Sequence, residues 1–153
     1  MDEFAKAKKY IKTISIVLFA ISLTQKCFCT TTTCSDSSMT FLLGWAGLLS
    51  GGAGITWLAN PCLFGAWITL KKNLKTSMFL SMFAFLIALG FLLFDNITDN
   101  EGGVSHRIIS YKPGYWLWVL STFCMLAGTF FLMAKSNSMK MSLSKPEKRD
   151  YLH

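Results

Sequence analysis

An uncharged stretch of 32 residues, from Met39 to Leu70, makes an integral membrane protein the expected class for this chain. Two further blocks, Met78 to Phe94 and Gly114 to Ala134, also lack Asp, Glu, Lys, Arg and His. An apolar helix needs about 20 residues to cross a hydrocarbon core of about 30 Å. With 52% apolar residues and a mean hydropathy of +0.43, the chain has too little charge to cover a soluble globule of 153 residues.

A fourth candidate span lies near the N-terminus, where Thr13 to Gln25 form an uncharged run of only 13 residues between Lys12 and Lys26. Lysines at helix ends can extend their ammonium groups to the headgroups, so a longer span over residues 10–28 is expected. The alternative is a cleaved signal peptide, because four lysines precede the apolar run. No small-x-small cleavage site follows that run, which favours the span.

The predicted fold is therefore all-α, a single domain over residues 1–153 with four transmembrane helices in a compact bundle. The expected spans cover residues 10–28, 39–70, 76–94 and 114–134, with short basic ends.

The basic residues are sorted by loop, so the net charge of +7 indicates topology and not nucleic-acid binding. With the N-terminus inside and four crossings, only Lys26, Arg107 and Lys112 lie outside. The other twelve of the fifteen lie inside: Lys6, Lys8, Lys9, Lys12, Lys71, Lys72, Lys75, Lys135, Lys140, Lys145, Lys148 and Arg149. This asymmetry predicts a multi-pass plasma-membrane protein, of the bacterial inner-membrane kind, with both termini cytoplasmic. The tail from Lys135 to His153 is expected to lie on anionic lipid.

The block from Met39 to Leu70 is too long for one perpendicular crossing, since 32 helical residues extend about 48 Å. Two crossings would place the lysines at 71, 72 and 75 outside, against the charge rule. We therefore expect one crossing from Met39 to about Ala59 and a break at Asn60-Pro61, because proline lacks an N–H and disfavours helix before it. Residues 62–70 would then form a kinked extension or lie along the inner interface.

Small residues recur at helical spacing in three of the spans. Gly44, Gly47, Gly51 and Gly54 form a glycine seam, Ser77, Ser81, Ala84 and Ala88 a second seam, and Ser121, Cys124 and Gly128 a third. Helices in lipid associate by close van der Waals packing, so these seams predict helix interfaces in a left-handed bundle. A hinge or a pore-lining stripe is the alternative for the glycines, and Asn60 beside Pro61 is a kink or a possible polar constriction.

Three of the five cysteines, Cys27, Cys29 and Cys34, gather in the first outer loop. In an oxidising compartment Cys34 can pair with Cys27 or Cys29, which leaves one thiol free, linked to another protomer or acylated. The helix count and the outward-facing thiols resemble those of disulfide-generating membrane oxidoreductases. That resemblance implies electron relay between cysteine pairs and a quinone, but the second outer loop, Asp95 to Pro113, has no cysteine. A structural bridge is the preferred interpretation.

The second outer loop carries a weak metal signal, formed by one histidine near three acids: Asp95, Asp99, Glu101 and His106, with Arg107 adjacent. The acidic run lacks a calcium-loop spacing, so a solvated loop without a metal is expected. Asn96-Ile97-Thr98 matches a glycosylation sequon, which matters only in a eukaryotic secretory membrane.

The spans contain no ionisable group of the kind that transporters, proton pumps and intramembrane hydrolases use, and both histidines, His106 and His153, lie outside them. The chain is expected to have no enzymatic activity, cofactor or metal. It is expected to act as an accessory or protective subunit or a membrane effector, through helix packing with itself or a membrane partner. An oligomeric channel is the first alternative, and thiol–disulfide chemistry is the second.

Overall fold

The structure is a computed structural model, which describes residues 2–98 and 105–144. Most of these residues are helical. The first half contains α1 (Asp2–Leu23), β1 (Lys26–Thr30), β2 (Cys34–Asp36), α2 (Ser37–Leu43), η1 (Gly44–Ala46), α3 (Gly47–Ser50), η2 (Gly52–Leu58) and α4 (Ala59–Thr69). The second half contains α5 (Leu74–Gly90), η3 (Phe91–Leu93), β3 (Asn96–Thr98), β4 (Ser105–Tyr111) and α6 (Pro113–Ser144).

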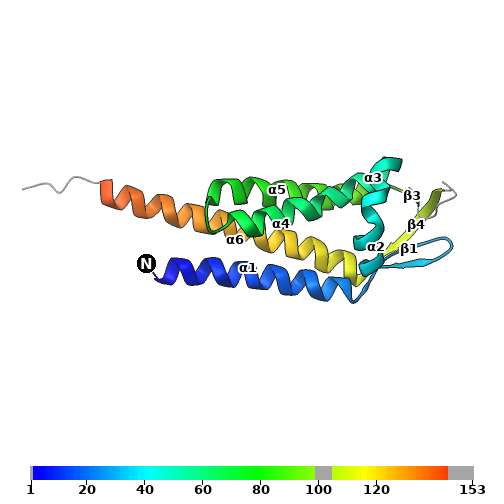
Figure 1. Cartoon of the computed structure of the whole chain (residues 1–153), viewed down its shortest axis with the longest axis horizontal. Helices are drawn as coiled ribbons and strands as arrows, with labels where there is room; N and C mark the ends of the chain where they lie inside the picture. The colour runs from blue at the N-terminus through cyan, green and yellow to red at the C-terminus, as the bar shows by residue number, and fades with distance from the viewer. Residues whose placement is uncertain (1, 99–104, 145–153) are drawn as a thin grey trace, which may run out of the picture.

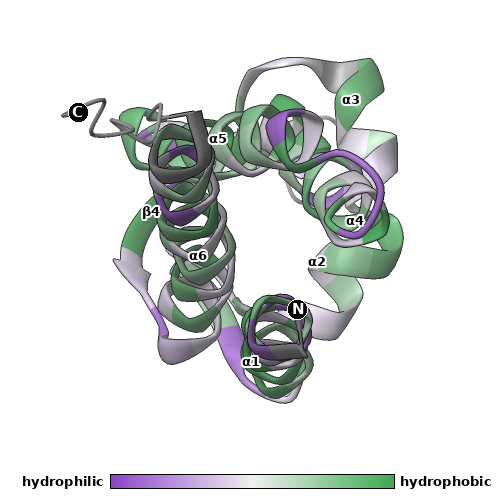
Figure 2. Cartoon of the chain, turned by 90° about the vertical axis from the view of Figure 1, so that its left-hand side faces the viewer, coloured by the Kyte–Doolittle hydropathy of each residue, from purple (hydrophilic) through white to green (hydrophobic). Residues whose placement is uncertain are grey.

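Four helices, α1, α4, α5 and α6, run lengthwise beside one another, and the strands gather at one end of them (Figure 1). Seen along the bundle, the helices follow the order α1, α6, α5, α4 around a ring (Figure 2). Neighbouring helices pack closely except for α1 and α4, whose backbones hardly approach each other. The start of α1, the α4–α5 turn and the end of α6 all lie at the end opposite the sheet (Figure 1).

The expectation of an all-α protein is wrong in one respect, because the two interhelical loops form a four-stranded antiparallel sheet of order β2-β1-β4-β3. Its centre joins segments far apart in sequence, since Phe28 is paired with Tyr111 and Cys29 with Ser110. The predicted span over residues 10–28 is correspondingly shorter at its C-terminal end: α1 ends at Leu23, and Phe28 lies in β1.

The apolar block from Met39 to Leu70 is also built differently from the prediction. The chain turns at Gly51 and Gly52, whose φ angles are +70° and +56°, and the segments Ser37–Leu49 and Gly52–Thr69 meet at 119°. Pro61 lies in the first turn of α4, where a missing N–H breaks no helical hydrogen bond. The break is therefore at the glycine pair and not at Asn60-Pro61. Residues 52–69 run along the bundle, whereas α2 and α3 cross its sheet-bearing end (Figure 1).

The predicted small-residue seam on the third span is confirmed. Ser77, Ser81, Ala84 and Ala88 are all fully buried on α5. On α6, Ser121 is fully buried, and a Cβ at Gly128 would overlap the side chain of Ile11 on α1. Small residues thus mark where α5 and α6 contact their neighbours, as expected for helices that associate by close packing.

Hydroxyl groups form hydrogen bonds between the helices. Ser77 Oγ donates to the Ala66 carbonyl of α4 at 2.8 Å, and Tyr115 Oη donates to the Ala88 carbonyl of α5 at 3.0 Å. The hydroxyls of Ser81 and Thr129 lie 3.2 Å apart between α5 and α6. These bonds satisfy polar groups in an interior that is otherwise apolar, and hydrogen bonds of this kind stabilise helix pairs in lipid.

Among residues 2–98 and 105–144, two helical segments are long and apolar enough to cross a membrane, Leu74–Leu93 and Pro113–Met139. The bent pair Ser37–Leu49 and Gly52–Thr69 makes a third if it counts as one span. The chain is therefore compatible with a membrane location.

Candidate functional site

The sheet-bearing end forms a cap, here defined as the strands β1 to β4 with α2 and α3. Its chemistry centres on the three cysteines of the first loop. Cys29 and Cys34, which face each other in the β1–β2 register, form a disulfide. This resolves the choice between Cys27 and Cys29 as the partner of Cys34. The bridge closes the turn Thr30 to Thr33, where Thr30 N–H also donates to the Thr33 carbonyl at 2.8 Å.

Cys27 is the remaining thiol of the cap, and it is buried. Burial raises its pKa to about 11, while the neighbouring Ser37 hydroxyl lowers it by a smaller amount. The thiolate is the nucleophilic form of cysteine, so this environment opposes the reactivity that thiol–disulfide exchange requires. Cys62 and Cys124 are also free thiols, and they lie on α4 and α6, away from the cap.

An aromatic cluster joins the cap to the helices. Phe91 lies 5.5 Å from Phe28 of β1, 5.9 Å from Tyr111 of β4 and 5.6 Å from Tyr115 of α6, between ring centroids. Burial, and secondarily the charge of Asp95, raises the pKa of Tyr111. On the outer edge, Lys26 Nζ lies 2.7 Å from an Asp36 carboxylate oxygen, with both side chains about half exposed. The cap thus packs on the helices through aromatic rings, and an exposed ion pair connects β1 with β2 at its surface.

The segment from Asp95 to Pro113, predicted to be a solvated outer loop, contributes β3 and β4 to the sheet. Asp95 accepts a backbone hydrogen bond from Ile108 at 2.8 Å, and Arg107 accepts one from Thr31 of the first loop at 3.1 Å. Asn96 of the sequon is paired with Arg107 in the β3–β4 register. Asp99 and Glu101, two of the three acids in the weak metal signal, lie outside the described residues. Within the described ranges no three His, Cys, Asp or Glu side chains gather as metal ligands.

The glycine seam does not lie on one continuous helix. A Cβ at Gly44 would overlap the indole of Trp57, and a Cβ at Gly54 would overlap the carbonyl of Gly47. The glycines therefore allow α3 and η2 to fold against each other at the turn, while Gly51 supplies the positive φ. Sequence spacing predicted a close approach along this seam, and the structure places that approach between segments on either side of the Gly51-Gly52 turn.

Asn60 is buried, and its Oδ1 accepts a hydrogen bond from Trp118 Nε1 of α6 at 2.9 Å. The side chain thus connects α4 with α6, a contact that sequence reasoning missed. A tryptophan near the end of a span is typical of the aromatic belt at a membrane interface. The position of Trp118 in the sequence therefore gives no sign that its indole binds Asn60.

The opposite end of the molecule carries a second feature, a cavity of about 940 Å³ between the start of α1 and the ends of α4 and α6. We call it the lysine cavity, because its lining includes Lys8, Lys9, Lys12, Lys71 and Lys135. These lysines were predicted to lie together on the inner side, but no sequence pattern indicates that they surround a cavity. The lysines and histidine of the tail after Ser144 lie outside the described residues.

No known protein family, curated protein or solved structure matches this chain.

Proposed function

We propose that this chain is a four-span plasma-membrane protein, of the bacterial inner-membrane kind, that has no enzymatic activity and acts through helix packing. In this proposal it is an accessory or protective subunit, or a membrane effector, and it packs against another membrane protein or a second copy of itself. The cap faces outward, and the lysine-rich end faces the cytoplasm.

The observation that carries the proposal is the division between the inside and the outside of the helices. Inside, small residues and hydroxyls pack closely and hydrogen-bond across the helix pairs. Outside, large apolar side chains are exposed on the lengthwise helices: Ile14, Val17 and Ile21 on α1, Ile68 on α4, Phe79, Phe83 and Leu86 on α5, and Leu120, Phe123, Phe130 and Phe131 on α6. A surface of this kind is suited to lipid or to a partner helix.

The charges support the orientation. Lys26 and Arg107 belong to the cap, and Lys112 follows β4 directly. The lysines from 6 to 12, those of the α4–α5 turn and Lys135 lie toward the other end (Figure 1). Under the positive-inside rule that second end is cytoplasmic. Four crossings follow if α1 and the η2–α4 segment span along with α5 and α6. α1 carries lysines in its first half, so it would depend on their snorkelling to the headgroups.

An ion flux assay in liposomes separates this proposal from the channel alternative. The accessory interpretation predicts no flux of potassium or of small solutes for the purified protein at any membrane potential. Flux of potassium or of small solutes through the wild-type protein would establish a pore and overturn the proposal.

The packing part of the proposal needs a separate measurement. Phe79, Phe83 and Leu86 recur at helical spacing on the exposed face of α5, which makes that face a candidate contact for a second copy. Resonance energy transfer between labelled copies in liposomes is expected to fall when Phe79 and Phe83 are both changed to alanine. The matched control changes Ile14 and Val17 of α1. If the α5 change leaves the transfer efficiency unaltered, or if the α1 control lowers it equally, self-association through the α5 face is excluded.

A further inference from the structure

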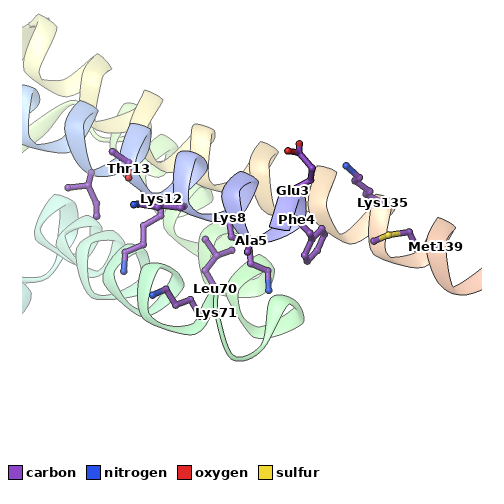
Figure 3. Close-up of a pocket in the computed structure, with 12 residues that line it drawn as sticks. Glu3, Phe4, Ala5, Lys8, Lys12, Thr13, Leu70, Lys71, Lys135 and Met139 are labelled. Atoms are coloured by element: carbon purple, nitrogen blue, oxygen red, sulfur yellow. The ribbon is translucent and has the colours of Figure 1, made fainter. Parts of the chain in front are cut away.

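The lysine cavity combines positive charge with an apolar wall. Its five lysines come from three segments that are distant in sequence: Lys8, Lys9 and Lys12 from α1, Lys71 from the α4–α5 turn, and Lys135 from α6. Figure 3 shows Lys8 and Lys12 on α1, Lys71 on the facing segment after α4, and Lys135 on α6 farther along the molecule. Glu3 is the acidic residue of the lining, and its carboxylate lies 3.7 Å from Nζ of Lys6, which does not line the cavity.

The apolar wall is formed by Phe4, Ile16, Leu70 and Met139, which lie on both sides of the lysines along the helices. Leu70 is almost fully buried. Lining residues on α1 extend from Glu3 to Ile16, and 13 residues of helix rise about 20 Å. On α1 the lining passes from Lys8 and Lys12 to Ile16, so that in the proposed orientation this apolar side chain lies on the acyl side of the lysines.

The cavity exists because α1 and α4 do not pack against each other at this end. Farther along, they are connected by side chains: Trp67 Nε1 donates to Ser15 Oγ at 2.9 Å, and the rings of Phe19 and Trp67 lie 5.7 Å apart. Between this connection and the start of α1 the helices leave an opening, and α6 forms its third wall. An opening between two lengthwise helices is accessible from the side, the direction from which a lipid enters.

We propose that the lysine cavity binds an anionic phospholipid of the inner leaflet. The phosphate is held by Lys8, Lys12 and Lys71, and an acyl chain lies along Ile16, the exposed apolar residue beyond Lys12. A cluster of ammonium groups matches a phosphate as point charges. The apolar wall matches the chain, which a soluble phosphate ester lacks. This inference rests on the proposed placement of the lysine-rich end at the cytoplasmic face.

Native mass spectrometry of the full-length protein in detergent tests the proposal with phosphatidylglycerol as the probe and phosphatidylcholine as the neutral comparison. Wild-type protein is expected to retain one phosphatidylglycerol in preference to phosphatidylcholine. Lys71→Gln is expected to weaken retention about fivefold, the effect of removing one lysine from an anionic lipid contact. Its matched control is Lys72→Gln, since Lys72 follows Lys71 directly but lines a different depression, beside Asn73 and Lys75. Lys72→Gln is expected to leave retention unchanged.

A second pair on α1 makes the same comparison, with Lys8→Gln in the cavity and Lys6→Gln outside it. Equal losses for the cavity and control variants would show general surface attraction and overturn the proposal. Equal retention of phosphatidylcholine would overturn it also. Displacement of the lipid by inorganic phosphate at matched concentration would identify the cavity as a site for free phosphate instead. None of these results bears on whether the helices span the bilayer, so a failure here is distinguishable from a failure of the proposed function.

Discussion

Ser15 and Ser121 exchange hydrogen bonds across the interface of α1 and α6. The Ser15 hydroxyl donates to the Ser121 carbonyl at 3.0 Å, and the Ser121 hydroxyl donates to the Ser15 carbonyl at 2.8 Å. Both side chains are fully buried. This reciprocal pair joins the first and last helices of the bundle, which are otherwise held together by apolar contacts such as that of Ile11 with Gly128.

Replacing Ser121 is expected to loosen the α1–α6 pair in proportion to the size of the new side chain. Ser121→Ala removes the bond that its hydroxyl donates to the Ser15 carbonyl and keeps the bond from Ser15 to the Ser121 carbonyl. It should lower the free energy of unfolding by about 1 kcal/mol, the scale for such bonds in membranes. Ser121→Leu should lower it more, because there is no space for the side chain. The measurement is unfolding in mixed detergent–dodecyl sulfate micelles, with exposed Leu120→Ala as the control. A smaller loss for Ser121→Leu than for Leu120→Ala would contradict the packing described here.

Alanine is expected to have opposite effects on stability at Gly54, in the glycine turn, and at Gly90, at the end of α5. Gly54→Ala places a Cβ against the Gly47 carbonyl, so α3 and η2 must separate, at a cost of about 1–3 kcal/mol. Gly90→Ala adds a Cβ where there is no atom within 4 Å, at the last residue of α5, and is expected to be neutral or to stabilise by up to about 1 kcal/mol. Thermal midpoints in one detergent compare the two variants. Equal shifts would mean that the Gly47–Gly54 contact is absent.

The disulfide predicts sensitivity of the cap to reductant. The double change of Cys29 and Cys34 to serine should lower the free energy of unfolding by about 2 kcal/mol, the value expected for closing a loop this short. Dithiothreitol should lower the thermal midpoint of the wild type but not that of this double variant. The control is Cys62→Ser, which keeps the bridge and should keep its sensitivity to reductant. Peptide mapping that found Cys27 joined to Cys34 would contradict the assignment.

Cys27 predicts a specific pH dependence. Its pKa is raised from 9.0 to about 11 in the folded state, so the folded protein holds the proton more tightly than the unfolded chain. The contribution to stability is fully present below pH 9 and is lost as the pH rises to about 11. Alkylation of native Cys27 by iodoacetamide should therefore stay slow at pH 8 and accelerate toward pH 11. Rapid alkylation at pH 8 in the folded protein would instead indicate an exposed and reactive thiol.

The small-residue seam of α5 could be predicted because it depends on one local rule, the helical spacing of Ser77, Ser81, Ala84 and Ala88. The glycine seam obeyed the same spacing, yet Gly51 adopts a positive φ that ends the helix between Gly47 and Gly54. Spacing alone cannot distinguish these cases, because a glycine permits both a close helix contact and a turn.

The sheet could not be predicted from local patterns, because it depends on pairing between distant segments. The strands β2 and β3 have only three residues each. The central pairing joins Cys29 to Ser110, which α4 and α5 separate in the sequence. For the same reason, the choice of Cys29 over Cys27 as the partner of Cys34 follows from the β1–β2 register and not from the cysteine spacing. The lysine cavity likewise depends on how α1, α4 and α6 are placed in space.

The central claim is that the cap and the lysine-rich end lie on opposite sides of a membrane. Labelling of intact spheroplasts with a membrane-impermeant amine-reactive ester, followed by peptide mapping, tests it on the unaltered full chain. We predict labelling of Lys26 before permeabilisation, and labelling of Lys71, Lys72 and Lys75 only after it. Labelling of the 71–75 turn together with Lys26 in intact spheroplasts would contradict the four-span arrangement.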